Sequence, residues 1–122
     1  MQAVNEKAKS IRLLILDVDG VLTTGAIYYG NHSANNDALE FKGFHVHDGL
    51  GIKLLQKTGV QVGVISAKTS HAVSRRLADL NIDHIHLGHE DKLPIYETLK
   101  QKLGLRDEQI AYMGDDLPDL PI

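Results

Sequence analysis

The feature that most constrains the fold is an apolar segment near the start of the chain that ends at two acidic residues. Residues 11–16 are apolar except for Arg12, Asp17 follows directly, and Asp19 comes two residues later. A nearly unbroken apolar segment is typical of a central parallel strand with both faces covered, because a half-exposed strand would alternate. In open α/β sheets, ligands gather at the carboxyl ends of such strands. The sequence therefore predicts that Asp17 lies at a ligand-binding edge and that the chain turns sharply at Gly20.

Strand-like and helix-like segments alternate along the rest of the chain. Three further strands are predicted at 60–65, 82–87 and 109–113, and three helices at 48–59, 70–80 and 92–103. The first helix has leucines at helical spacing and closes on a glycine that suits the position after a helix end. Strands that alternate with helices favour right-handed crossovers. We therefore expect an α/β fold, a doubly wound, Rossmann-like parallel sheet, in a single domain over residues 1–122.

Two short β-prone segments, 25–30 and 38–44, are joined by polar turn formers directly after the first strand. This pattern predicts a β-hairpin. The hairpin could be a flap over the site, an oligomer contact or a decoration. Its many apolar residues favour the first two, because an isolated ribbon would leave them in water.

The composition excludes several classes of protein. Hydrophobic residues make up 43% of the chain, charged residues 24%, and the net charge is −3. This is an ordinary globular composition without a basic surface for nucleic acid or an anionic membrane. The absence of cysteine excludes disulfides and thiol catalysis. With no signal peptide or membrane span in the sequence, we expect a cytoplasmic protein.

Reactive side chains also follow the three later strands, in the order hydroxyl, lysine and acid cluster. They are Ser66, Lys92, Asp115, Asp116 and Asp119. Phosphoryl transfer to a carboxylate needs a nucleophile, a second acid, a cation, a hydroxyl donor and a metal. Carboxylates that converge on one cleft repel each other unless a cation neutralises them, and oxygen ligands suit Mg²⁺.

Each part of this pattern also has a simpler explanation. Two acids after a strand can start a polar turn or form a generic binding site for a divalent metal. The serine of the pattern, or Ser70, can cap the next helix, and Lys92 can be a solvated side chain. The last acids can complement a helix dipole. His84, His86 and His89 could gather as a zinc site, although a polar surface near the cleft is the simpler expectation.

The string Asp17-Val-Asp-Gly-Val-Leu-Thr resembles the first motif of the haloacid dehalogenase superfamily of phosphatases. Ser66, Lys92 and the string Gly114-Asp-Asp-Leu-Pro-Asp resemble its second, third and fourth motifs, so the resemblance covers residues 11–122. The strings Phe44-His-Val-His-Asp-Gly-Leu-Gly-Ile and Asp-Leu-Pro-Asp-Leu-Pro are similar to a capless branch, the 3-deoxy-D-manno-octulosonate 8-phosphate phosphatases. The resemblance implies a homotetramer in which the hairpin helps to roof a neighbour's site.

The resemblance also implies an activity. It would be Mg²⁺-dependent hydrolysis of a small phosphorylated sugar acid through an aspartyl-phosphate, for lipopolysaccharide precursor synthesis. Asp17 would attack phosphorus, and Asp19 would protonate the leaving oxygen and later activate water. The Asp17 carboxylate, the Asp19 carbonyl and Asp115 would hold Mg²⁺, with Asp116 and Asp119 in support.

The resemblance assigns substrate binding to Asp19, Ser66, Ala67, Lys68 and Lys92, with catalytic roles for the serine and Lys92. Relatives usually have Ser/Thr-Gly-Arg where this chain has Ser66-Ala67-Lys68. The alanine adds a Cβ beside the phosphate, and the lysine offers a point charge in place of an arginine fork. Relatives also continue for a further helix, strand and tail, so we expect this domain to lack its usual C-terminal segment.

Two other functions compete with a phosphatase. A phosphoacceptor receiver module has a similar length, sheet and acid pair, but its phosphorylated aspartate ends the third strand. Here that strand ends at Leu87-Gly88, and the last acid cluster has no place in a receiver. The second rival is a catalytically idle haloacid dehalogenase-like domain kept for oligomerisation. The presence of every motif carboxylate argues against it.

Overall fold

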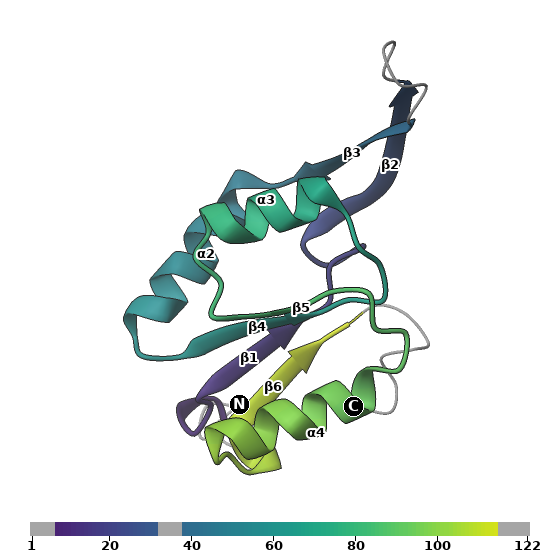
Figure 1. The fold of residues 1–122 in the computed structure, drawn as a ribbon. Helices are drawn as coiled ribbons and strands as arrows, with labels where there is room; N and C mark the ends of the chain where they lie inside the picture. Colours follow the sequence, from purple (N-terminus) through teal and green to yellow (C-terminus); the bar gives the residue numbers. More distant parts are fainter. Residues whose placement is uncertain (1–6, 32–37, 115–122) are drawn as a thin grey trace.

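The computed structural model describes residues 7–31 and 38–114, which form a parallel sheet between helices and a separate two-stranded ribbon (Figure 1). The elements are β1 (Leu13–Leu16), β2 (Thr23–Asn31), β3 (Ala38–Phe44), α2 (Val46–Lys57), β4 (Gln61–Ile65), α3 (His71–Asp79), β5 (His84–His86), α4 (Lys92–Leu103), the 3-10 turn η1 (Asp107–Gln109) and β6 (Ile110–Met113). The sheet has the order β5-β4-β1-β6, and all its pairs are parallel. The predicted doubly wound α/β fold with a hairpin after the first strand is confirmed.

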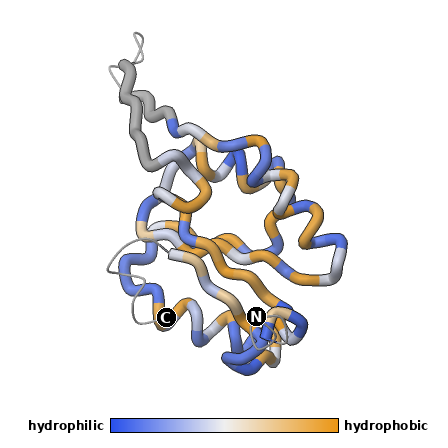
Figure 2. The backbone as a smooth tube through the Cα atoms, turned by 180° about the vertical axis from the view of Figure 1, so that it is seen from behind, coloured by the Kyte–Doolittle hydropathy of each residue, from blue (hydrophilic) through white to orange (hydrophobic). Residues whose placement is uncertain are grey.

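The apolar segment predicted as the central strand is β1, and both of its faces are covered. Successive strand residues point to opposite faces. Leu13 and Ile15 join a cluster with α4, whereas Leu16 joins a second cluster with α2 and α3. Figure 2 shows hydrophobic residues running along the strands of the sheet. The missing polar alternation in the sequence is therefore the result of helices on both faces.

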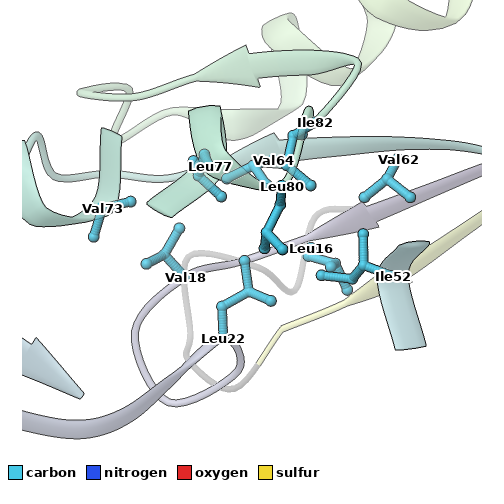
Figure 3. Packing of buried hydrophobic residues seen from close by; sticks show 10 residues of the cluster. All are labelled: Leu16, Val18, Leu22, Ile52, Val62, Val64, Val73, Leu77, Leu80 and Ile82. Carbon is cyan, nitrogen blue, oxygen red and sulfur yellow. The ribbon is translucent and has the colours of Figure 1, made fainter. Parts of the chain in front are cut away.

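The larger cluster also fixes the loop that follows β1. Its members come from β1, β4, α2, α3 and adjoining loops (Figure 3): Leu16, Val18, Leu22, Ile52, Val62, Val64, Val73, Leu77, Leu80 and Ile82. Val18 is 1% exposed and Leu22 is 6% exposed. Burying an aliphatic side chain of this size contributes about 1.5–3 kcal/mol. These two residues therefore anchor the loop of residues 17–22, here called the acidic loop, to the core.

Helix α2 begins two residues earlier than predicted, because a histidine caps it. The Nδ1 atom of His45 accepts from the N–H of His47 at 3.1 Å. At the other end Thr58 is the last cap residue and Gly59 has φ +95°, as the predicted glycine stop requires.

The buried face of α2 differs from what its leucines suggest. Leu50 and Leu54 are more than half exposed, whereas Gly49 and Ile52 are buried. Leucine spacing therefore predicted the helix but not the face that packs.

No helix within residues 7–31 and 38–114 is long and apolar enough to cross a membrane. The predicted roofing by the hairpin depends on side chains of residues 25–41, which lie outside the part whose side chains the structure describes. The backbone of the ribbon is antiparallel, with an irregularity between Thr23 and Ile27.

A polar cluster ties α4 to the turn that leads into β6. The Tyr96 hydroxyl donates to Asp107 Oδ1 at 2.5 Å, and Lys100 Nζ contacts the same oxygen at 3.0 Å. Burial, and then the bond to Asp107, raise the pKa of Tyr96 to about 12. The bonds from Tyr96 and Lys100 lower the pKa of Asp107. Both shifts favour a neutral tyrosine beside an ionised aspartate.

Tyr96→Phe tests this cluster. A raised tyrosine pKa contributes stability below pH 10 that is lost as the pH rises toward 12. A lowered aspartate pKa contributes stability above pH about 4 that is lost on acidification. We expect Tyr96→Phe to lower Tm by about 3–6 °C near pH 7 and by less at either extreme. Melts from pH 3 to 11 check this, and a pH-independent difference would contradict it.

Candidate active site

Asp17 follows β1, where the order in which the chain adds strands to the sheet reverses. From β1 the chain continues to β4 and β5 on one side, and β6 pairs with β1 on the other. Such a switch point leaves a crevice outside the carboxyl ends of the strands. The Asp17 N–H donates to the Met113 carbonyl at 2.9 Å, which extends the pairing of β1 with β6 by one residue. The aspartate is thus held by the sheet itself, as the apolar segment predicted.

A lysine at the start of α4 meets this aspartate. Asp17 continues the alternation of Leu13 and Ile15, so its position belongs to the face that α4 covers. Lys92 is the first residue of α4, and its Nζ contacts Asp17 Oδ1 at 3.0 Å. The two side chains are 3% and 9% exposed, and Lys92 Nζ lies 3.5 Å from the Tyr112 hydroxyl.

A buried lysine at the start of a helix is unfavourable for the stability of the fold. A cation in the first turn of a helix opposes the helix dipole, and a buried ion pair repays its desolvation poorly. The pair instead supplies a fixed positive charge beside a fixed carboxylate. The alternative of a solvated Lys92 is wrong, because the side chain is buried.

The loop after Asp17 is tightly wound around one carbonyl. The Val18 carbonyl accepts from three N–H groups, those of residues 21, 22 and 23, at 2.8–3.2 Å. Gly20 has φ +78°, and its N–H donates to Thr23 Oγ1 at 3.2 Å. Because Val18 is buried in the core, the acids on either side of it are fixed at their backbones. The Asp19 side chain is 36% exposed.

Asp19 is paired with a residue that the sequence analysis missed. Lys42 of β3 places its Nζ 2.8 Å from Asp19 Oδ1, and the lysine side chain is 2% exposed. The sequence signal is faint: a single cation in the otherwise largely apolar segment 38–44. Only the folding of the ribbon back onto the loop reveals the contact.

Ser66 directly follows β4, which lies next to β1 in the sheet, and is 3% exposed. Its N–H donates to the His86 carbonyl at 2.9 Å, and its own carbonyl accepts from His89 N–H at 3.0 Å. Its Oγ accepts from the Lys68 N–H at 3.3 Å. The helix cap is Ser70, whose Oγ accepts from a backbone N–H of α3, so Ser66 is not the cap.

The remaining predicted site residues are less constrained or lie outside the described part. Lys68 is exposed and Ala67 is half-buried, both in the loop between β4 and α3. Asp115, Asp116 and Asp119 lie outside the described residues.

The histidine zinc site does not form. In the described ranges, no three His, Cys, Asp or Glu side chains are grouped so that they could hold a metal ion. Burial lowers the pKa of His84 and of His86, and the ring of His86 lies 6.4 Å from that of His89. The backbones of His86 and His89 are hydrogen-bonded to Ser66, whereas His84 Nε2 lies 2.6 Å from Gln61 Oε1 at the start of β4.

Comparisons with known proteins identify the family. The solved 3-deoxy-D-manno-octulosonate 8-phosphate phosphatase from Moraxella catarrhalis, in complex with a magnesium ion, a phosphate ion and a KDO molecule, is 41% identical. Its TM-score is 0.89, and the match covers 99% of this chain and 67% of that chain. The chain belongs to the 3-deoxy-D-manno-octulosonate 8-phosphate phosphatase family. This family lies within the haloacid dehalogenase superfamily, to which a 45% identical structure from Legionella pneumophila also belongs.

Other members of the phosphatase family are similarly close to this chain in sequence. The curated enzyme of Escherichia coli is 43% identical over 119 residues, which are 98% of this chain and 61% of the relative. The cobalt-bound enzyme from Haemophilus influenzae is 44% identical, with a TM-score of 0.81, over 94% of this chain and 64% of that chain. The chain spans about three fifths of the length of the curated relatives it matches. No protein-family model matches it.

The buried pair of this phosphatase-family chain can be tested by its stability. We expect Lys92→Met to destabilise the fold by about 3 kcal/mol, because it leaves the buried Asp17 carboxylate without its ammonium. Lys102→Met, which removes an exposed lysine of the same helix, should change stability by less than about 0.5 kcal/mol. Urea unfolding measures both. A smaller loss for Lys92→Met in an Asp17→Asn background would confirm the coupling, and equal losses would disprove it.

Proposed function

We propose that this chain is a phosphomonoester hydrolase that acts through an aspartyl-phosphate on Asp17. The observation that carries the proposal is the buried contact of Asp17 with Lys92 at the switch point, with a second, accessible acid two residues further on. A carboxylate held rigidly beside a cation is suited to attack phosphorus, because the cation offsets the charge of the incoming phosphoryl group. Membership of the phosphatase family supports the same reaction.

The first step transfers the phosphoryl group to Asp17. An Asp17 oxygen bonds to phosphorus while the bond from phosphorus to the sugar oxygen breaks. Asp19, carrying a proton, gives it to the leaving oxygen, so the products are the free alcohol, the aspartyl-phosphate and an Asp19 carboxylate. The partly exposed side chain of Asp19 can reach a substrate in the crevice.

The second step returns the enzyme to its starting state. The Asp19 carboxylate takes a proton from water as the water oxygen attacks phosphorus, and the bond to Asp17 breaks. Inorganic phosphate leaves with Asp17 ionised again beside Lys92. General acid and base catalysis of this kind contributes about 10²–10⁴ in rate.

The phosphoryl oxygens are bound by groups around Asp17. Lys92 supplies positive charge from the α4 side. Ser66 lies at the neighbouring strand end; because its Oγ already accepts from a backbone N–H, its hydroxyl hydrogen can donate to phosphate. The backbone at Ala67 and the side chain of Lys68 follow in the same loop and complete the substrate-binding set.

The donor set fits Mg²⁺. Asp17 offers a buried carboxylate at the sheet edge, and Asp19 offers a backbone carbonyl in the tight loop, so both donors are oxygen, which Mg²⁺ prefers. Asp115 is the proposed third ligand, with Asp116 and Asp119 in support. When bound, the ion would neutralise negative charge on the phosphoryl group.

The proposed substrate is 3-deoxy-D-manno-octulosonate 8-phosphate, a small phosphorylated sugar acid whose free form would serve lipopolysaccharide precursor synthesis. The similarity to the relative solved with magnesium, phosphate and KDO supports it. We further propose a single domain over residues 1–122, a homotetramer and a cytoplasmic location, with no nucleic-acid or membrane partner. The point charge of Lys68 would hold the sugar less rigidly than an arginine fork.

Asp17→Asn tests the reaction directly. We expect phosphate release from the sugar acid phosphate to require Mg²⁺ and to vanish in this variant, since an amide cannot form the phosphoenzyme. Phosphate release is measured with and without EDTA, and circular dichroism controls for folding. Full turnover in EDTA, or activity in the variant, would contradict the mechanism.

Asp19→Asn tests the acid and base. We expect formation and hydrolysis of the phosphoenzyme both to slow by about 10²–10⁴ on an alkyl phosphate. Rapid-quench measurement of the phosphoenzyme separates the two steps. A variant within a few-fold of the unmodified chain would show that another group carries the proton.

A further inference from the structure

We propose that Lys42 is a positioning residue that holds Asp19 in the orientation needed to activate water. The inference rests on the proposed function and adds a residue to it. It assigns a catalytic consequence to the ribbon that follows β1, because Lys42 is supplied by β3 and not by the acidic loop.

The contact between Lys42 and Asp19 is not an ordinary surface ion pair. Surface pairs hold two mobile, exposed side chains and contribute about 0–1 kcal/mol. Here the Lys42 side chain is 2% exposed and reaches Asp19 Oδ1 at 2.8 Å, a short charge-assisted hydrogen bond. Burying a lysine costs stability unless a negative group meets it. Asp19 supplies such a negative group, so the burial of the Lys42 side chain depends on a contact with the acidic loop.

The backbone of Lys42 is anchored to the core through its own strand, β3. Two residues further on, Phe44 packs against the main core cluster and pairs in register with Thr23. Asp19 is fixed from the other direction by Val18 in the same cluster. The ion pair thus joins two anchored segments, and the rotamer of a partly exposed aspartate becomes determined by a second element.

The chemistry predicts which step depends on this contact. After Asp19 has given its proton to the leaving group it is a carboxylate, and its next task is to take a proton from water. The Lys42 ammonium holds Oδ1 of that carboxylate at 2.8 Å, so Oδ2 is the oxygen that takes the proton from water. An unheld Asp19 would sample rotamers that face solvent, and misplacement by 1 Å can cost about 10²-fold in rate.

The test uses p-nitrophenyl phosphate with Mg²⁺, because nitrophenolate leaves without needing a proton. The first step is then insensitive to Asp19, and the second step is not. We expect Lys42→Met to keep the rapid burst of nitrophenolate and to slow steady turnover by about 10–100-fold, with phosphoenzyme accumulating. Lys42→Arg should recover part of the rate. Lys53→Met, which removes an exposed lysine of α2, should behave as the unmodified chain.

A double-variant measurement shows whether Lys42 acts through Asp19. In an Asp19→Asn background, Lys42→Met should slow turnover by less than about two-fold further. Lys42→Gln repeats the comparison if the methionine variant does not fold. Loss of burst and turnover in equal measure, an undiminished effect beside Asp19→Asn, or unchanged kinetics would each overturn the proposal. Release of nitrophenolate that does not depend on Asp17 in the otherwise unmodified chain would instead overturn the proposed function on which it rests.

Discussion

The burial of β1 on both faces is the constraint on which the rest of the structure depends. Its odd positions, Leu13 and Ile15, pack under α4, and Leu16 packs under α2 and α3. The same alternation assigns the next position, Asp17, to the α4 face, where the first residue of that helix meets it. The two-residue alternation of the strand therefore places apolar side chains in the core and puts the Asp17 position on the face that α4 covers. The position of Asp17 thus follows from the packing pattern of β1, extended by one residue.

Charge is distributed around the acidic loop in a way that packing alone would not favour. Each acid of the pair faces a lysine whose side chain is almost fully buried, Lys92 from α4 and Lys42 from β3. Two buried ammonium groups are expensive unless opposite charge compensates them. The two lysines belong to separate elements, so contacts from α4 and from β3 both hold the acidic loop. Charges placed at a cost to stability are typical of functional sites in general.

The elements were predictable because their signals are local. Apolar continuity indicated β1 and β4, and the glycine stop of α2 appears with positive φ at Gly59. The start of α2 was missed because His45 is an unusual cap, and the buried face of α2 was missed because two of its leucines point to solvent. Which face of an amphipathic helix packs depends on what lies beneath it. A leucine pattern alone does not carry that information.

By itself, the sequence determined the parallel sheet, the edge at which Asp17 and Asp19 stand, and the order of hydroxyl and lysine at later strand ends. These follow from short-range periodicity and from the rule that parallel strands end at one edge. Only the tertiary structure decided that Ser70 and not Ser66 caps α3, that Lys92 is buried, and that Lys42 reaches Asp19. Each of these depends on contacts between segments far apart in the chain. Burial and ion pairing are properties of such contacts, and no local pattern specifies them.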